Sequence, residues 1–132
     1  MPDKRHRSRR QPRPMCEVAQ AALEEAKGDN IVVLDVRQLT DITDYMIVAT
    51  GTSERHVKTL AERVLERMRE AGWRHLGMEG FEDADWVLVD FVDVVVHIMR
   101  PPTRQRYNLE GLWDENLGEL LASEKSHSTG AL

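Results

Sequence analysis

The sequence predicts a single α+β domain in which a mixed β-sheet of about five strands is flanked by helices. At 132 residues, the chain is long enough for one domain and too short for two. Short β-branched runs alternate with segments whose apolar residues recur at helical spacing. One strand–helix–strand unit near the middle of the chain is typical of a crossover between parallel strands.

The first helix and the first two strands are expected within the first fifty residues. Met15–Lys27 carries apolar side chains at helical spacing, and Gly28 is expected to cap this helix at its C-terminus. Ile31–Val36 is a continuous β-branched run, which predicts a buried strand. A turn over Gln38–Thr43 then leads to a second strand, Tyr45–Thr50.

A second helix is expected directly after the turn Gly51–Ser53, with Thr52 or Ser53 as its N-cap. Its apolar stripe consists of Val57, Leu60, Ala61, Val64, Leu65 and Met68. Gly72 ends the helix, and a strand is expected at about Arg74–Met78. Strand, helix and strand together predict a right-handed crossover between parallel strands.

Two further strands, Trp86–Asp90 and Asp93–Met99, are separated by only two residues, which predicts a tight hairpin. The turn residues, Phe91 and Val92, are not the Gly, Asn or Asp that turns favour. Either Phe91 is exposed at the tip, as part of a surface that a partner covers, or it folds back as a lid over the core.

Short closing helices are expected at Arg104–Trp113 and Glu115–Leu121. The domain is therefore expected to span residues 15–122, between a basic disordered tail at 1–14 and a flexible tail at 123–132.

Net charge divides the chain into two unlike parts. Residues 1–14 hold six Lys/Arg against Asp3 alone, a net of +5, so the other 118 residues carry −10 out of the total of −5. The basic tail is either an arm that binds RNA phosphates or an extension upstream of a domain that begins at Met15. The single cysteine, Cys16, and the lack of an apolar run of about 20 residues predict a protein of the cytoplasm.

The turn Gly51–Ser53 is the best candidate for catalytic chemistry. A Gly-Thr-Ser turn before a helix can hold phosphate on its backbone N–H groups, and nucleotidyltransferases use a similar Gly-Ser turn. Those enzymes also need two carboxylates on the next strand for Mg²⁺, whereas Asp83 and Asp85 fall in a loop. The pattern predicts a nucleotidyltransferase-like layer without its metal site, and a turn that serves as a helix cap.

The histidines do not form a pattern for metal binding. His56, His75 and His97 fall on three different elements, and close pairs or a cysteine cluster are lacking. No metal site and no cofactor are therefore expected. His97 shares a strand face with Val95 and Met99 and is either a hydrogen-bonded core residue or a contact residue.

An acidic surface with an aromatic anchor is predicted around the hairpin. Strand alternation places Val87 and Val89 in the core and Trp86 on the more polar face. The neighbouring acids are Glu79, Glu82, Asp83, Asp85, Asp90 and Asp93. Acids at a rim steer a basic partner, while a desolvated aromatic residue supplies affinity, so the pattern favours binding over catalysis.

The motifs GMEG, DWVLVDFVDVVVHIM and RQRYNLEGLW (77–80, 85–99 and 104–113) resemble the ribosomal silencing factors, also called Iojap-like proteins. AKGDNIVVLDV, ITDYMIVATGTSERHV and AGW match upstream in the same order, so the resemblance runs from about Met15 to Trp113. The family usually has Gly where this chain has Val92.

The resemblance implies a protein that is not an enzyme. Such factors dock on the large ribosomal subunit through ribosomal protein L-fourteen and sterically block joining of the small subunit, which restrains translation when nutrients are short. The resemblance points to Trp86 and Phe91 as docking residues, and the acidic rim adds Glu79, Asp90 and Asp93, with His97 as a further contact. It also implies a homodimer. The hairpin edge could serve the dimer contact instead of the docking contact.

Two other functions stay open at this point. One is a nucleotide- or metal-dependent transferase built on the turn Gly51–Ser53. The other is an RNA binder that acts through its basic tail.

Overall fold

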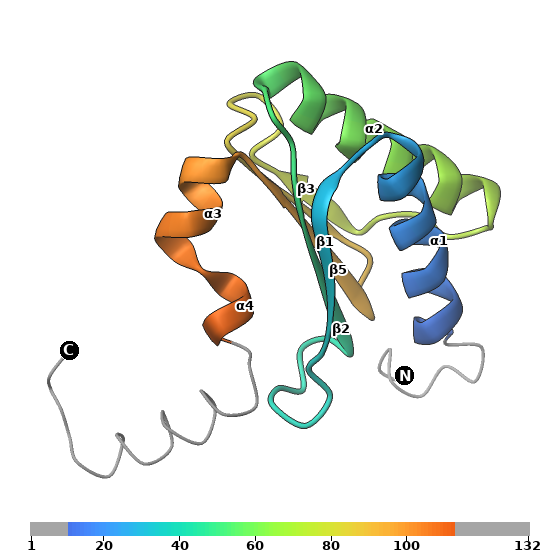
Figure 1. Cartoon of the computed structure of the whole chain (residues 1–132). Coiled ribbons are helices and arrows are strands. Elements are labelled where there is room, and N and C mark those ends of the chain that lie inside the picture. The colour runs from blue at the N-terminus through green and yellow to red at the C-terminus, as the bar shows by residue number, and fades with distance from the viewer. Residues whose placement is uncertain (1–10, 113–132) are drawn as a thin grey trace, which may run out of the picture.

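A five-stranded sheet with helices on both faces forms the fold in a computed structural model, which describes residues 11–112. Figure 1 shows the two longer helices together on one face and the two short ones on the other. The elements are α1 (Pro12–Glu25), β1 (Asp29–Asp35), β2 (Tyr45–Thr50), α2 (Glu54–Glu70), β3 (Gly77–Glu79), β4 (Trp86–Asp90), β5 (Val94–Met99), α3 (Pro101–Tyr107) and α4 (Leu109–Leu112). The predicted α+β class with a mixed five-stranded sheet is confirmed.

The strand order in the sheet is β1-β2-β5-β4-β3. β2 and β5 run parallel, and the other neighbouring pairs are antiparallel. The predicted crossover is only partly right. α2 does connect β2 to β3, and the strand pairings give β2 and β3 the same direction. The two strands are not neighbours, however, because β5 and β4 lie between them. β3 is also shorter than predicted and begins at Gly77 instead of Arg74.

The main core lies between the sheet and the pair α1 and α2. The buried face of α2 consists of Val57, Leu60, Ala61, Val64 and Met68, five of the six residues of the predicted stripe; the sixth, Leu65, is half-buried. Strand alternation adds Val87 and Val89 of β4 and Val94, Val96 and Ile98 of β5, all fully buried. β2 is buried on both of its faces, which is why it reads as a near-continuous apolar run.

Helix α1 differs from the prediction at both ends. It begins at Pro12, three residues before the expected start, because proline tolerates the first helical turn, where its missing N–H is not needed. At the other end Lys27, with φ +66°, takes the left-handed position that Gly28 was expected to take. Gly28 N–H instead donates to Leu23 O at 2.8 Å, and Lys27 N–H to Glu24 O at 3.0 Å, which is a Schellman motif.

Strand β1 is an edge strand and not the buried strand that its β-branched run predicted. It pairs on one side only, with β2, and four of its seven residues are exposed: Asp29, Asn30, Val33 and Asp35. β-branched residues suit an edge strand as well as a central one, so composition alone could not separate the two. β2 spans Tyr45–Thr50 as predicted and is buried throughout.

The closing segment forms two short helices on the second face. α3 ends at Tyr107, and the next residue, Asn108, has a φ of +47° that turns the chain into α4. The buried guanidinium of Arg104 anchors α3 to the sheet by donating to Asn30 O at 2.6 Å and Thr50 Oγ1 at 2.8 Å, and it pairs with Glu110 at 2.9 Å. This charged group tolerates burial because its donors are satisfied.

Three predictions concern residues outside the range 11–112: the helix at Glu115–Leu121, the tail at 123–132 and most of the tail at 1–14. Within that range, no helix combines the length and apolar character that crossing a lipid bilayer requires.

Candidate partner-binding site

The second face of the sheet carries the predicted site. A small buried cluster, Val36, Met46, Val48 and Met99, lies here, with Leu34, Trp86 and Leu109 packed against it. Beyond this cluster the face keeps partly exposed side chains. We call these the open face: Leu34 of β1, Val95 of β5, Leu88 and Asp90 of β4, and Glu79 of β3. It is an apolar strip with carboxylates at the β3–β4 side.

Trp86 stands beside this strip, held between two other rings. Its Nε1–H donates to Nδ1 of His97 on the neighbouring strand at 2.9 Å. The ring of Tyr107 on α3 lies 4.9 Å from the Trp86 ring, centroid to centroid, at an angle of 46°. Trp86 is half-buried and Tyr107 is 50% exposed. The indole is therefore fixed in direction while part of its surface stays accessible.

His97 is only 5% exposed, and burial lowers its pKa to about 4. Because Nδ1 accepts from Trp86, the neutral ring must carry its proton on Nε2. Nε2 is buried and has no hydrogen-bond partner among residues 11–112. Of the two interpretations of His97, the hydrogen-bonded core residue fits the structure, although the residue supports the face on which Trp86 lies.

Phe91 was expected at a docking surface outside the core, and this placement is wrong. The side chain is 4% exposed and belongs to the main core, so the lid interpretation applies. The turn has room for this because Val92 takes the positive φ of +78° and the chain reverses behind it. Phe91 N–H then donates to Val94 O at 2.9 Å, and the ring makes an edge-to-face contact with His75, with 6.5 Å between the ring centroids.

The three predicted rim acids lie in different environments. Glu79 is exposed on β3, opposite Leu88. Asp90 is half-buried and accepts from Val92 N–H at 2.7 Å, which holds the turn. Asp93 is 7% exposed, and its carbonyl accepts from the N–H groups of Asp44 and Tyr45, so the interpretation of Asp93 as a surface acid is wrong.

The hairpin also offers no free edge for a dimer contact. β4 pairs with β3 on one side and β5 on the other, while β5 pairs with β2. The unpaired edges of the sheet belong to β1 and β3.

The turn Gly51–Ser53 uses its backbone donors within the protein. Gly51 N–H donates to Met99 O at 3.0 Å, and Thr52 N–H to Nδ1 of His56 at 2.9 Å. Ser53 caps α2 by accepting from His56 N–H at 3.1 Å. A Cβ at Gly51 would come within 2.7 Å of Val57, so the helix packs closely over the turn. These contacts support the helix cap that the sequence predicted.

The remaining titratable residues do not assemble a catalytic centre within the part of the chain that the structure describes. No group of three His, Cys, Asp or Glu side chains there is arranged to hold a metal ion. Asp85 instead pairs with Arg100 at 3.2 Å, and His56 joins α2 to Ala26 O at 3.0 Å. Cys16 is buried, which raises the pKa of its thiol to about 11, so the thiolate is disfavoured.

Tyr107 is the contributor to this site that the sequence analysis did not single out. It falls in the closing helix, and sequence alone does not show that α3 folds back onto Trp86. The available signal was the aromatic residue in the motif RQRYNLEGLW, in a chain with only 5% aromatics.

Comparison with known proteins identifies the family. Residues 9–130 match the model of a family described as "Ribosomal silencing factor during starvation". Ribosomal silencing factor RsfS of Chromobacterium violaceum is 51% identical over 92 residues, which cover 70% of this chain and 75% of that protein. The protein of the same name from Haemophilus influenzae is 41% identical over 99 residues, which cover 75% and 97%.

The fold matches as well. A crystal structure of a Chromobacterium violaceum protein superposes with a TM-score of 0.77 at 46% identity, and covers 79% of this chain and 87% of that one. The class defined here is thus a regulatory, ribosome-associated α+β protein with an open sheet face. The chain belongs to the ribosomal silencing factor family.

Proposed function

We propose that this protein binds the large ribosomal subunit through the open face of its sheet and sterically blocks joining of the small subunit. The partner on the large subunit is ribosomal protein L-fourteen, and the outcome is restrained translation when nutrients are limiting. The proposal includes a cytoplasmic homodimer. It requires no bond chemistry, because a bound protein of this size occupies space that the small subunit needs.

The observation that carries the proposal is the fixed, partly exposed indole of Trp86 beside an apolar strip. The bond to His97 and the ring of Tyr107 hold the indole in place before any partner arrives. An aromatic side chain that is already ordered loses little conformational entropy on binding, which is why such residues dominate interface energies. Leu88 and Val95 extend the same surface as partly exposed apolar neighbours.

Charge supports a basic partner. Glu79 and Asp90 border the strip, and residues 15–132 carry a net charge of −10. Complementary charges steer association and fix register, and their effect weakens with salt. Phe91 and Asp93 are no longer part of this surface, because both side chains are buried.

Sedimentation with purified subunits tests the proposal. The protein should travel with large subunits and not with small ones, and its binding should weaken as salt is raised. Equal association with both subunits would contradict it. The same protein, run alone at equilibrium, should sediment as a dimer.

A further inference from the structure

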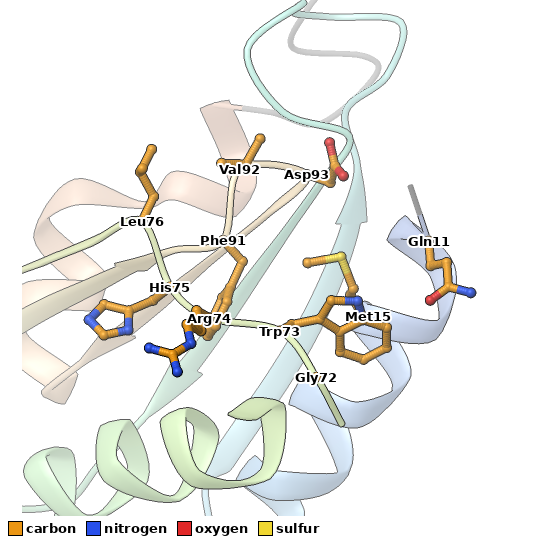
Figure 2. Close-up of a pocket in the computed structure, with 10 residues that line it drawn as sticks. All are labelled: Gln11, Met15, Gly72, Trp73, Arg74, His75, Leu76, Phe91, Val92 and Asp93. Atoms are coloured by element: carbon orange, nitrogen blue, oxygen red, sulfur yellow. The ribbon is translucent and has the colours of Figure 1, made fainter. Parts of the chain in front are cut away.

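We infer a second binding site, for single-stranded RNA, in the groove between the start of α1, the segment 72–76 and the β4–β5 turn. The groove holds a cavity of about 530 Å³. Figure 2 shows its walls: Gln11 just before α1 and Met15 on it, Trp73 to Leu76 along the connecting segment, and Val92 at the turn. It is lined by other residues than the open face, and the proposed docking function does not use it.

One part of the groove is apolar and suits a base. Trp73 is half-buried beside Met15, where both side chains meet the cavity. Leu76 is 72% exposed at the opposite rim, next to Val92. Single-stranded nucleic acids bind largely by stacking their bases on such aromatic side chains, and this stacking tolerates any base.

The other part of the groove carries a cationic side chain, Arg74. Arg74 and His75 are exposed, and both also line an adjoining hollow of about 200 Å³ together with Arg69. Neither Arg69 nor Arg74 has an ion-pair partner within residues 11–112. Nearby, Arg67 is engaged with Glu25 at 2.8 Å and with Glu70 at 3.1 Å. Within residues 11–112 these two guanidinium groups are therefore not neutralised by a carboxylate, and they can meet phosphates.

The sequence directly before Gln11 adds positive charge. Gln11 lines the groove, and the ten residues before it include Lys4 and four arginines. The rest of the chain is acidic, so general attraction to RNA is not expected away from this end. Asp93 lies on the wall by the turn, which places the phosphates on the side of Arg74. A recessed aromatic residue suits an unpaired strand, because bases in a duplex are stacked on one another.

Fluorescence anisotropy of the full chain tests the site without any ribosome, so its failure is separate from failure of the docking proposal. The probe is a fluorescein-labelled oligouridine of about 12 nucleotides, within the usual span of one binding module. The variants are Trp73→Leu and the double charge reversal Arg69→Glu with Arg74→Glu. The control is Arg55→Glu with Arg106→Glu, two exposed arginines elsewhere with the same change in net charge. Melting curves of all variants verify folding.

The charge reversal in the groove should weaken binding about tenfold or more. It should also reduce the slope of log Kd against the logarithm of salt concentration by about 1.4. Each of the two lost phosphate contacts accounts for about 0.7 of this change. Trp73→Leu should weaken binding at least about fivefold, the loss of one stacked base. The control should remain within about twofold of the unaltered chain.

Four results would overturn the inference. The groove variants would bind as the control does, or deletion of residues 1–10 alone would abolish binding while the groove variants kept it. A duplex of the same length would bind as tightly as the single strand. If the chain bound no oligouridine at all, the groove would be left to a protein partner.

Discussion

Trp86 and His97 are joined across β4 and β5 by an indole N–H that donates to an imidazole nitrogen at 2.9 Å. This bond links two roles that the sequence presented as separate: a contact residue and a histidine in an apolar strand. His97 lies beneath the face and Trp86 is half-buried at its surface, so the buried residue fixes the partly exposed one. The accessible part of the face thus depends on a polar pair inside it.

The first prediction concerns pH. Burial lowers the pKa of His97 from 6.5 to about 4. Between pH 6.5 and pH 4, His97 is therefore protonated in the unfolded chain and neutral in the folded chain. The contribution of His97 to stability is therefore complete above pH 6.5 and is lost as pH falls toward 4. The loss is about 3 kcal/mol. Urea unfolding at several pH values between 7 and 4 measures it.

The matched variant is His97→Gln, which cannot titrate and retains an acceptor for the indole. Its stability should fall less steeply with decreasing pH than that of the unaltered protein. If the stability of the two proteins depended on pH in the same way, the pKa of His97 would not be lowered by folding.

The second prediction separates core from surface at the hairpin. Phe91→Ala should lower the free energy of unfolding by about 3–5 kcal/mol, because it removes a buried ring from the main core. Leu76→Ala nearby should change it by less than about 0.5 kcal/mol, since that side chain is 72% exposed. Chemical denaturation compares the two. Similar, small effects would restore the exposed tip that the sequence had suggested.

The third prediction concerns the turn before α2. Ser53→Ala removes the acceptor of the His56 N–H and should cost about 1 kcal/mol of stability. Binding to large subunits should stay nearly unchanged, because Ser53 lies away from the open face. Reduced binding at an unaltered melting temperature would instead indicate a ligand or partner site at this turn.

The fourth prediction uses the strained residue of the β4–β5 turn. Val92 has a φ of +78°, which is unfavourable for a β-branched residue and natural for glycine. Val92→Gly should therefore raise the free energy of unfolding by about 1 kcal/mol. Val92→Ala keeps a Cβ and should raise the free energy of unfolding much less. Equal stability of the two variants would mean that the backbone is not strained there.

The sequence predicted most of the fold because local patterns determined it. The bounds of β2 and β4, the N-cap Ser53 and the buried stripe of α2 all followed from side-chain periodicity and capping preferences. The position of β1 at an edge and that of β3 across the sheet did not follow. Both depend on which strands become neighbours, and periodicity within one strand carries no such information.

The candidate site was predicted only in part, for a related reason. Alternation placed Trp86 and Leu88 on the right face, because it depends on strand geometry alone. The direction of Phe91 depends on the backbone of a turn whose residues give no standard signal. The ring of Tyr107 reaches Trp86 only because Arg104 anchors α3 on the sheet, a contact between residues distant in sequence.

The fifth prediction concerns the anchor itself. Trp86→Ala should weaken binding to large subunits by about 2 kcal/mol, or roughly thirtyfold. The indole also packs against the cluster of the second face, so some stability is lost as well. Trp86→Phe keeps most of this packing and should lose mainly the bond to His97. Sedimentation binding beside a melting curve for each variant separates the two effects, and unchanged affinity in Trp86→Ala would remove Trp86 from the interface.

The most direct measurement is the yield of joined ribosomes when purified subunits are mixed with the protein. Leu88→Arg puts a charge in the middle of the open face, while Val33→Arg puts the same charge on an exposed strand position that faces the other way. The unaltered protein and Val33→Arg should lower the yield of joined ribosomes equally. Leu88→Arg should leave the yield near that of subunits alone. Melting curves should show that all three proteins are folded. Full inhibition of joining by Leu88→Arg would contradict docking through the open face.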